Sequence, residues 1–400
     1  MSRLFPPRAT APEHQWENKG RRSVQYLTVN GPVEITRTVY WNRQQGAVTP
    51  ADQWLGMNEG RYSVGVRELC CREAAHSDFR TAAEDLAWVG QIQVSPETLR
   101  GIVETEGRRA LSQQRSGTLG PAWTAQDCRS GPQEPTCVVA GADGVMVPQV
   151  TEAEKEKRRK RRGRRQKGQA PRRPIRRGSD LPYKEFKIAV FYDPAKDHQY
   201  AIGISGGPTQ LGQRIRRIAC QLQLDEAEIT YRVSDGALWI RGLYRIQLPM
   251  LQAHILDYYH FRDHVIGASQ VVYGQGTAES QQWRKEICGV MLEQGPEAVL
   301  SRLAELRKTL RAAPKRQALE NLSQYIAKRK DMLRYPQFVA AGYEIGSGPT
   351  EAFCKTLTSR LKGPGMRWDK PNAEAVMALA SVRASDSWGT YWDRRRKIPA

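Results

Sequence analysis

The spacing of apolar residues changes along this chain, first alternating, then helical, and later a mixture of the two. Apolar positions alternate over residues 24–41 around an Asn-Gly pair, a pattern that predicts a β-hairpin. Over residues 62–113 they recur every three or four positions, which predicts three helices. Ser77 and Ser95 stand where the second and third helices should be capped, and Pro96 suits a first helical position. The N-terminal part is therefore expected to be a hairpin followed by helices.

Short apolar segments from residue 137 onward predict the strands of a mixed sheet flanked by helices. The expected strands span 137–148, 185–192, 198–205 and 228–233, with a last one that begins at Ala253. An amphipathic helix at 208–222 separates two of them. The fold class is therefore α/β.

Helical spacing returns over residues 278–335, which indicates an all-helical insertion. The chain then turns at Gly346-Ser347-Gly348, and Pro349 suits the start of a further helix. That helix should end at Gly363-Pro364-Gly365, a strong breaker cluster. A final short helix is expected at 373–382.

These patterns divide the chain into segments with different expected roles. The expected boundaries are 1–61 for an N-terminal tail and hairpin, 62–113 for the three helices, 114–137 for a Gly-, Ser- and Pro-rich linker, and 138–392 for the α/β core, within which 151–182 is a basic loop and 275–340 the helical insertion. The helices of 62–113, with a basic third helix, resemble a helix-turn-helix DNA reader. An ordinary three-helix bundle with solvated arginines is the favoured interpretation of these helices taken alone, since no specific signature is present.

The net charge of the chain indicates what kind of molecule it binds. Its 400 residues carry a net charge of +20, with a pI of about 9.8, which favours a polyanionic partner and nucleic acid first. Half of that excess lies in residues 151–180, where fourteen Lys or Arg face four acidic residues. Such a segment repels itself and is expected to be disordered alone and to contact phosphates without reading bases.

The cysteines and the apolar runs exclude several other classes. The seven cysteines are scattered and contain no Cys-x-x-Cys, so a disulfide framework and a cysteine-rich zinc site are poorly supported. No run of about 18 apolar residues predicts a membrane span, and no apolar signal core is found at the N-terminus. We therefore expect no membrane partner and a cytoplasmic location.

Three acidic residues stand where catalytic carboxylates could meet. Asp143 lies on the first predicted core strand, Asp235 follows a later strand directly, and Glu351 lies in the first turn of a helix. Together they could hold two Mg²⁺ ions about 4 Å apart for an in-line phosphoryl transfer, with Mn²⁺ able to substitute. Each residue also has a purely structural explanation, since Asp-Gly pairs form turns and a first-turn Glu complements the helix dipole.

A second cluster of polar residues follows the last predicted strand. Asp257, His260 and His264 could share one helix face and bind a metal ion. A hydrogen-bonded structural cluster is the favoured interpretation, because no Cys or second His pair completes a zinc site.

Five segments, in this order and at this spacing, resemble the DDE transposases of bacterial insertion sequences, specifically the ISKra group. They are Asp143-Gly-Val-Met-Val-Pro, Asp235-Gly-Ala-Leu-Trp-Ile, Leu256-Asp-Tyr-Tyr-His-Phe-Arg-Asp-His, Ile345-Gly-Ser-Gly-Pro-Thr-Glu-Ala-Phe-Cys-Lys and Arg360-Leu-Lys-Gly-Pro-Gly-Met-Arg-Trp. The resemblance is best over about 138–392 and weaker over 24–113.

Many relatives carry a Cys-x-x-Cys pair after the hairpin, and residues 40–46 of this chain contain no cysteine. A zinc ribbon is therefore not expected here.

The resemblance implies an RNase H-like catalytic core and an insertion-sequence transposase that cleaves DNA at the element ends and transfers strands. It implies that Asp143, Asp235 and Glu351 are the catalytic acids and metal ligands, with His260 and Trp239 in support. It also implies a homo-oligomer on double-stranded DNA, both terminal repeats and target. The alternative is a catalytically inactive, domesticated relative that still binds DNA.

Ten basic residues are expected to contact DNA phosphates. They are Arg100, Arg108, Arg158, Arg161, Arg164, Arg214, Arg217, Lys355, Arg360 and Lys362.

Overall fold

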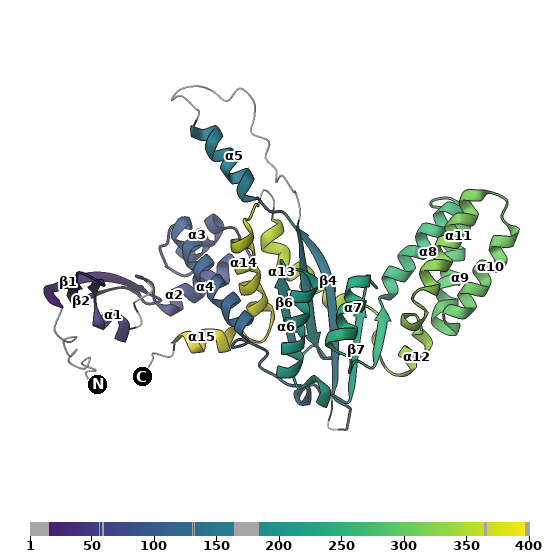
Figure 1. The fold of residues 1–400 in the computed structure, drawn as a ribbon, viewed down its shortest axis with the longest axis horizontal. Coiled ribbons are helices and arrows are strands. Elements are labelled where there is room, and N and C mark those ends of the chain that lie inside the picture. The colour runs from purple at the N-terminus through teal and green to yellow at the C-terminus, as the bar shows by residue number, and fades with distance from the viewer. Residues whose placement is uncertain are drawn as a thin grey trace.

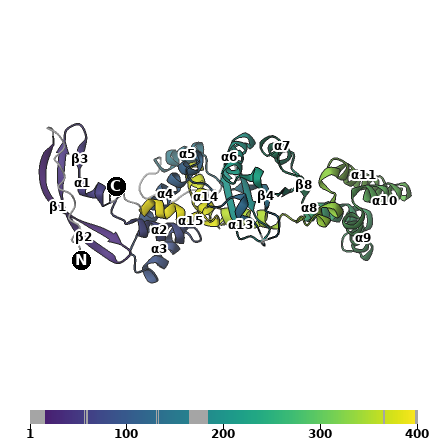
Figure 2. The ribbon, with the colours of Figure 1, turned by 90° about the horizontal axis from the view of Figure 1, so that it is seen from below.

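The computed structural model describes residues 16–55, 57, 60–129, 131, 133–163, 184–363 and 366–396. Three parts lie in a row: a β-hairpin at one end, a sheet with its covering helices in the middle, and a bundle of helices at the other end (Figure 1). The same order is visible after a quarter turn (Figure 2).

The centre of the molecule is a mixed sheet that, within the described residues, has five strands in the order β6-β5-β4-β7-β8. The middle strand is β4 (Cys137–Val147). On one side β5 (Lys184–Tyr192) and β6 (Gln199–Ile204) continue the sheet antiparallel. On the other side β7 (Ile229–Ser234) and β8 (Ala253–Leu256) run parallel. The predicted mixed sheet flanked by helices is confirmed.

Alternation along β4 gives the sheet two buried faces. Val138 and Ala140 belong to the core cluster shared with α6 (Pro208–Gln221) and α7 (Leu238–Gln247). Val139 belongs to the opposite cluster, shared with α13 (Gly348–Lys362) and α14 (Lys370–Ala384). Because both faces are covered, the strands read as nearly continuous apolar runs.

The N-terminal hairpin is formed by β1 (Glu17–Thr28) and β2 (Gly31–Asn42), with β3 (Gly46–Val48) completing a small sheet beside α1 (Pro50–Trp54). Most β1 side chains are exposed, and the hairpin stands away from the sheet of the core (Figure 2).

The three helices that follow are α2 (Val64–Ala74), α3 (Phe79–Trp88) and α4 (Pro96–Ser116). Ser95 caps α4 as predicted, whereas the prediction for α3 was wrong by one residue. Asp78, not Ser77, caps α3, because its carboxylate accepts hydrogen bonds from the Arg80 and Thr81 backbone.

Helix α4 packs closely against α14 of the core. A Cβ on Gly107 would overlap the backbone of Ala375, so only glycine permits this approach. The buried face of α4 therefore belongs to the same hydrophobic cluster as α13 and α14.

The segment 114–137, predicted to be a linker, packs against the core. Leu119, Trp123, Ala125 and Cys128 are buried, and a short 3-10 helix, η1 (Ala125–Asp127), lies against the core. The segment is polar on average, so its composition predicted a linker, although a few large apolar residues hold it against the core.

The first part of the basic block forms helix α5 (Glu152–Gly163), which projects from the sheet (Figure 1), so the prediction of disorder was wrong there. Its acidic first turn complements the helix dipole, and Lys160 pairs with Glu156. Lys155 anchors the helix through an ion pair with Asp369, the N-cap of α14, at 2.8 Å. Residues 164–183 of the block lie outside the described residues.

The helical bundle contains α8 (Tyr258–Tyr273), α9 (Ala278–Gln294), α10 (Pro296–Thr309), α11 (Ala313–Ala327) and α12 (Tyr335–Ala340). Helix α8 packs against α9 and α11, so the bundle includes a helix that the expected insertion of 275–340 leaves out. The 3-10 turns η2 (Leu224–Glu226) and η3 (Lys330–Met332) complete the core and the bundle, and α15 (Trp388–Arg396) ends the described chain.

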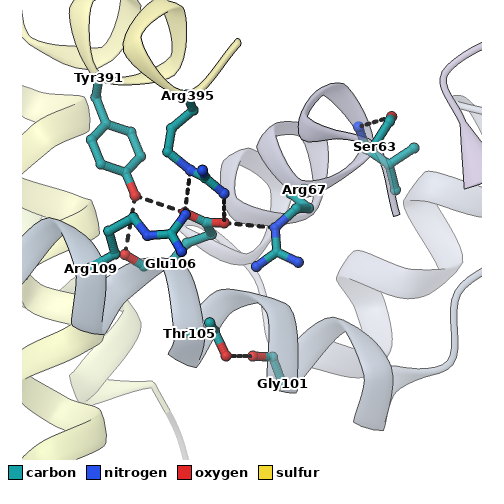
Figure 3. A network of polar contacts seen from close by, with 9 residues as sticks. Ser63, Arg67, Gly101, Thr105, Glu106, Arg109, Tyr391 and Arg395 are labelled. Carbon is teal, nitrogen blue, oxygen red and sulfur yellow. Dashed lines mark hydrogen bonds and ion pairs between the residues drawn. The ribbon is translucent and has the colours of Figure 1, made fainter. Parts of the chain in front are cut away.

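A buried ionic cluster joins α4 to α15 (Figure 3). The Glu106 side chain is fully buried and accepts hydrogen bonds from Arg67 at 2.6 Å, Tyr391 at 2.8 Å and Arg395 at 3.1 Å. Burial alone would raise the pKa of Glu106, but the bond from Arg395 and the charges of Arg67 and Arg395 outweigh it and hold that pKa below its usual value. Glu106 is therefore ionised and fully paired.

Candidate active site

Helix α13 lies directly on the middle strand of the sheet. Gly141 makes this possible, because a Cβ at that position would overlap the hydroxyl oxygen of Thr350. Thr350 precedes Glu351, so the contact brings the first turn of α13 over β4. Asp143 lies two residues beyond Gly141 and points to the same face. One close contact thus sets Glu351 and Asp143 on the same side of the sheet.

Asp143 is half-buried at this junction. Its carboxylate accepts the backbone N–H of Gly144 at 2.6 Å and a weak hydrogen bond from the Cys354 thiol at 3.7 Å. Burial raises the pKa of Asp143, and the negative charge of Asp235 raises it further. The ionised form of Asp143 therefore lacks a strong cationic partner among the described residues.

Asp235 directly follows β7, which runs parallel to the strand of Asp143 and pairs with it as far as Gly141 and Val233. Its negative charge acts on the Asp143 carboxyl, so the two carboxylates are neighbours. The Asp235 carboxylate accepts the backbone N–H of Ala237 at 2.9 Å. Gly236 has a φ of +76°, a conformation that favours glycine, and it bends the chain away from the strand.

Glu351 completes the arrangement from above the sheet. Its side chain is exposed, and the Ser347 hydroxyl donates to it at 3.4 Å. A cavity of about 740 Å³, here called the acid cavity, is lined by Asp143, His260, Glu351, Cys354, Lys355 and Lys362 together with Gly144, Val145, Met146, Thr358 and Ser359. Asp235 is not part of its lining.

Asp257 connects the two helices that border the acid cavity. Its side chain is fully buried, and it caps α8 by accepting the backbone N–H of His260 at 2.9 Å. Its other oxygen accepts the backbone N–H of Ser347, just before α13. Asp257 therefore fixes the backbone at His260 and at the start of the helix that carries Glu351. Both Asp257 oxygens are thus occupied by backbone N–H groups, which argues against a metal-ligand role for this residue.

His264 does not reach the acid cavity. Its ring stacks on Tyr325, with the ring centres 3.7 Å apart, in the neighbouring helical bundle. His260 and His264 line one cavity in the helical bundle, whereas the hydrogen bonds described for Asp257 come from backbone N–H groups. The hydrogen-bonded side-chain cluster that the sequence favoured is therefore not found among these described residues.

The donor atoms at the acid cavity suit Mg²⁺, although they do not form a closed ligand set. Within the described ranges no group of three or more His, Cys, Asp or Glu side chains is placed to hold a metal ion. Mg²⁺ is commonly bound by one or two carboxylates together with water and substrate phosphate, so a complete protein cage is not required. The raised pKa of Asp143 is the observation that fits a cation, because a nearby positive charge would stabilise both neighbouring carboxylates.

The basic residues predicted to contact DNA fall into separate groups. Lys355 and Lys362 line the acid cavity. Arg214 and Arg217 lie on α6, which covers the opposite face of the sheet, and Arg217 donates to the Arg115 carbonyl. Among the predicted cations whose side chains are described, these two lysines line the cavity that holds the acids.

The remaining predicted cations are paired, buried or outside the described side chains. Arg100 pairs with Glu97, and Arg108 donates to Asn372 at 3.0 Å. Arg360 is 4 % exposed, stacks between the rings of Phe79 and Trp368, and donates to the Ala74 carbonyl at 3.1 Å, so the expectation of a surface phosphate contact was wrong. The side chains of Arg158 and Arg161 are not described, and Arg164 lies outside the described residues.

Trp239 is placed away from the acid cavity. It lies on α7, and the ammonium of the buried Lys187 sits over its ring at 4.3 Å. Lys187 pairs with Gly144 in the β4–β5 register, so Trp239 packs beneath the strand that carries Asp143. A supporting role remains a prediction.

Two residues at the site were missed by the sequence reasoning. Cys354 donates to Asp143, and its place one helical turn after Glu351 was the available signal. Arg329 donates to the Gly236 carbonyl at 3.4 Å from the end of the helical bundle. No local pattern could have revealed that contact, since 93 residues separate the two.

Comparisons with known proteins give a limited picture. The model of an uncharacterised protein family (UPF0236) matches residues 9–122, which cover the hairpin and α2 to α4. A comparison of the sequence with curated proteins found no match. The Drosophila P element transposase strand transfer complex is among the solved structures that resemble this chain. The match has 12% identity and a TM-score of 0.29, and covers 86% of this chain and 84% of the other. A TM-score this low carries no argument about fold or function.

In the part of the chain that the structure describes, no helix is long and apolar enough to cross a membrane.

Proposed function

We propose that this chain is an insertion-sequence transposase, similar to the ISKra group of DDE transposases, that cleaves and joins DNA strands at the acid cavity. The observation that carries the proposal is the meeting of Asp143 and Glu351, far apart in sequence, in one cavity with Asp235 beside them. The sheet order β6-β5-β4-β7-β8 supports an RNase H-like core, with α9 to α12 inserted before the last acid.

The charges around the cavity suit a phosphodiester substrate. Lys355 and Lys362 lie at the same cavity as the acids and can hold the phosphates on either side of the reacting one. Asp143, Asp235 and Glu351 would hold two Mg²⁺ ions, which supply neutralisation of the phosphate and of the attacking and leaving oxygens. Mn²⁺ can substitute for Mg²⁺ in this role.

The reaction is an exchange of phosphorus–oxygen bonds. In cleavage, the oxygen of a water molecule forms a bond to the phosphorus at the element end, and the bond to the 3′ oxygen breaks, which leaves a free 3′-hydroxyl. In joining, that hydroxyl forms a bond to a phosphorus of target DNA, and the target 3′ oxygen leaves. Asp257 keeps the backbone of α8 and α13 fixed during both steps. His260, at the cavity, is in a position to orient the substrate.

The test is cleavage and joining of labelled DNA that carries the ends of the element and its flanking DNA. The wild type should nick at the ends when Mg²⁺ or Mn²⁺ is present and yield joined products with target DNA. Asp235→Asn should lose both reactions, whereas Asp225→Asn, an exposed acid on η2, should keep them. Nicking without joined products would identify a nuclease, and tight binding with no cleavage by any variant would identify an inactive DNA-binding relative.

A further inference from the structure

A second cavity, of about 650 Å³, lies between α8 and α11 next to the acid cavity. Its volume lies in the range of about 300–1,000 Å³ that is usual for ligand sites. His260 lines both cavities, so the two cavities are neighbours that meet at this residue. This second cavity is called the bundle cavity below.

The lining of the bundle cavity is basic. Lys328 and Arg329 lie at its edge together with His260 and His264, and Asp263 is the one acid among the described lining residues. His264 and Lys328 are exposed, so a ligand can reach them from solvent. A phosphate group is therefore the favoured contact for this edge.

The bundle cavity also offers flat rings and amide groups. The ring of His264 stacks on Tyr325, and the guanidinium of Arg329 lies over Tyr325 at 4.2 Å. The amides of Asn321 and Gln324 belong to the same lining and are exposed. Stacked rings beside hydrogen-bonding amides and cations are the combination with which proteins bind unpaired nucleotides.

The bundle cavity is tied to the catalytic loop. Arg329 donates to the Gly236 carbonyl at 3.4 Å, and Gly236 follows Asp235. In addition, Arg241 of α7 pairs with Asp331 at 2.8 Å and donates to the Lys328 carbonyl at 3.3 Å. The turn that carries Lys328 and Arg329 is thus docked on the segment after Asp235, which sets the bundle cavity at a fixed place relative to the acids.

We propose that the bundle cavity binds the DNA strand that flanks the reacting phosphodiester, with a phosphate at Lys328 and a nucleotide against the His264 ring. This inference rests on the proposed function, since it assumes that DNA occupies the acid cavity. It assigns the helical bundle a direct part in holding flanking DNA.

The test compares DNA binding of Lys328→Glu with that of Lys285→Glu, an exposed lysine on α9 outside the cavity lining. Binding is measured by fluorescence anisotropy in EDTA, so cleavage plays no part. Two duplexes are used, one whose element end carries its flanking DNA as a single strand, and one that stops at the element end. Circular dichroism checks that both variants fold.

Lys328→Glu should raise Kd about tenfold for the DNA with the flank and less than about twofold for the DNA without it. Lys285→Glu should change neither Kd by more than about twofold. An equal loss with both DNAs, or no loss with either, would overturn the proposal. If the wild type binds neither DNA, the proposed function itself fails.

Discussion

Glu106 and Asp143 are two carboxylates of this protein with opposite surroundings. Glu106 is fully buried, and its carboxylate accepts hydrogen bonds from two arginines and a tyrosine hydroxyl. Asp143 is half-buried, has another carboxylate beside it and receives only a backbone N–H and a thiol among the hydrogen bonds described. The pKa of Glu106 is therefore lowered, and the pKa of Asp143 is raised.

The difference is the one expected between a structural acid and the catalytic acid that we propose. A buried charge must be paired to be tolerated, and Glu106 meets that requirement within the fold. The carboxylates of Asp143 and Asp235 repel one another, which lowers the stability of the fold. Like-charge pairs of this kind are characteristic of functional sites. Asp257 stands between the two cases, because it is fully buried but satisfied by backbone N–H groups.

The largest expected effect comes from removing the structural acid. Glu106→Gln leaves Arg67, whose side chain is 4% exposed, as a buried charge without its carboxylate. The free energy of unfolding should fall by about 3 kcal/mol or more. Urea denaturation measures it, with Glu97→Gln as the control, since its exposed pair with Arg100 should contribute less than about 1 kcal/mol. If both variants lost the same small free energy of unfolding, Glu106 would be no more important to stability than an exposed acid.

The next effect concerns Asp257. Asp257→Ala removes the cap of α8 and the acceptor for the Ser347 N–H, and we expect a loss of about 2 kcal/mol in the free energy of unfolding. Cleavage should fall as well, because His260 and Glu351 lose their common support. Asp257→Asn, which keeps one side-chain acceptor, should recover part of the stability. A stable Asp257→Ala variant with full cleavage would refute the positioning role.

A smaller effect should follow from added cation. Mn²⁺ at ten times its dissociation constant should raise the free energy of unfolding by about 1.4 kcal/mol if it binds only the folded chain. Thermal unfolding with Mn²⁺ or EDTA measures this. The gain should vanish in Glu351→Gln and persist in Glu344→Gln, whose residue precedes α13 and lies outside the acid cavity lining. A gain that survives Glu351→Gln would place the cation elsewhere.

The smallest expected effect is a stabilisation. A raised pKa means that the folded state binds the proton of Asp143 more tightly than the unfolded state does, so the ionised carboxylate costs stability above that pKa. In EDTA at neutral pH, Asp143→Asn should therefore increase the free energy of unfolding by about 0.5–1 kcal/mol. The gain should fade as pH falls through the raised pKa of Asp143. A loss of stability at neutral pH would contradict this sign.

Local patterns were sufficient to predict much of the fold and part of the site. The hairpin, the strand that carries Asp143 and the helix that carries Glu351 each have their own periodicity or breaker residues, and the structure contains all three. Asp143 was proposed from its place on the first core strand and Glu351 from its place in the first turn of a helix, and the two line one cavity.

The contacts that the sequence could not predict join residues far apart in the chain. The partners of Glu106 lie 39, 285 and 289 residues away, so nothing near Glu106 indicated its pairing. Arg360 has the spacing of a solvent-facing cation, yet the rings of Phe79 and Trp368 enclose it. Helix α5 was hidden by its charge, because its anchor is the ion pair of Lys155 with Asp369.

The most direct measurement is to map the cation site on the folded protein bound to DNA. Fe²⁺ with ascorbate releases hydroxyl radicals where the ion binds, and these cut the nearby polypeptide backbone. Cuts should appear near Asp143, Asp235 and Glu351, three segments distant in sequence, and none near Glu106. Mg²⁺ should suppress them, and Glu351→Gln should weaken all three together. Cuts that avoid Asp143 and Glu351, or persist unchanged in Glu351→Gln, would contradict a cation-dependent centre at the acid cavity.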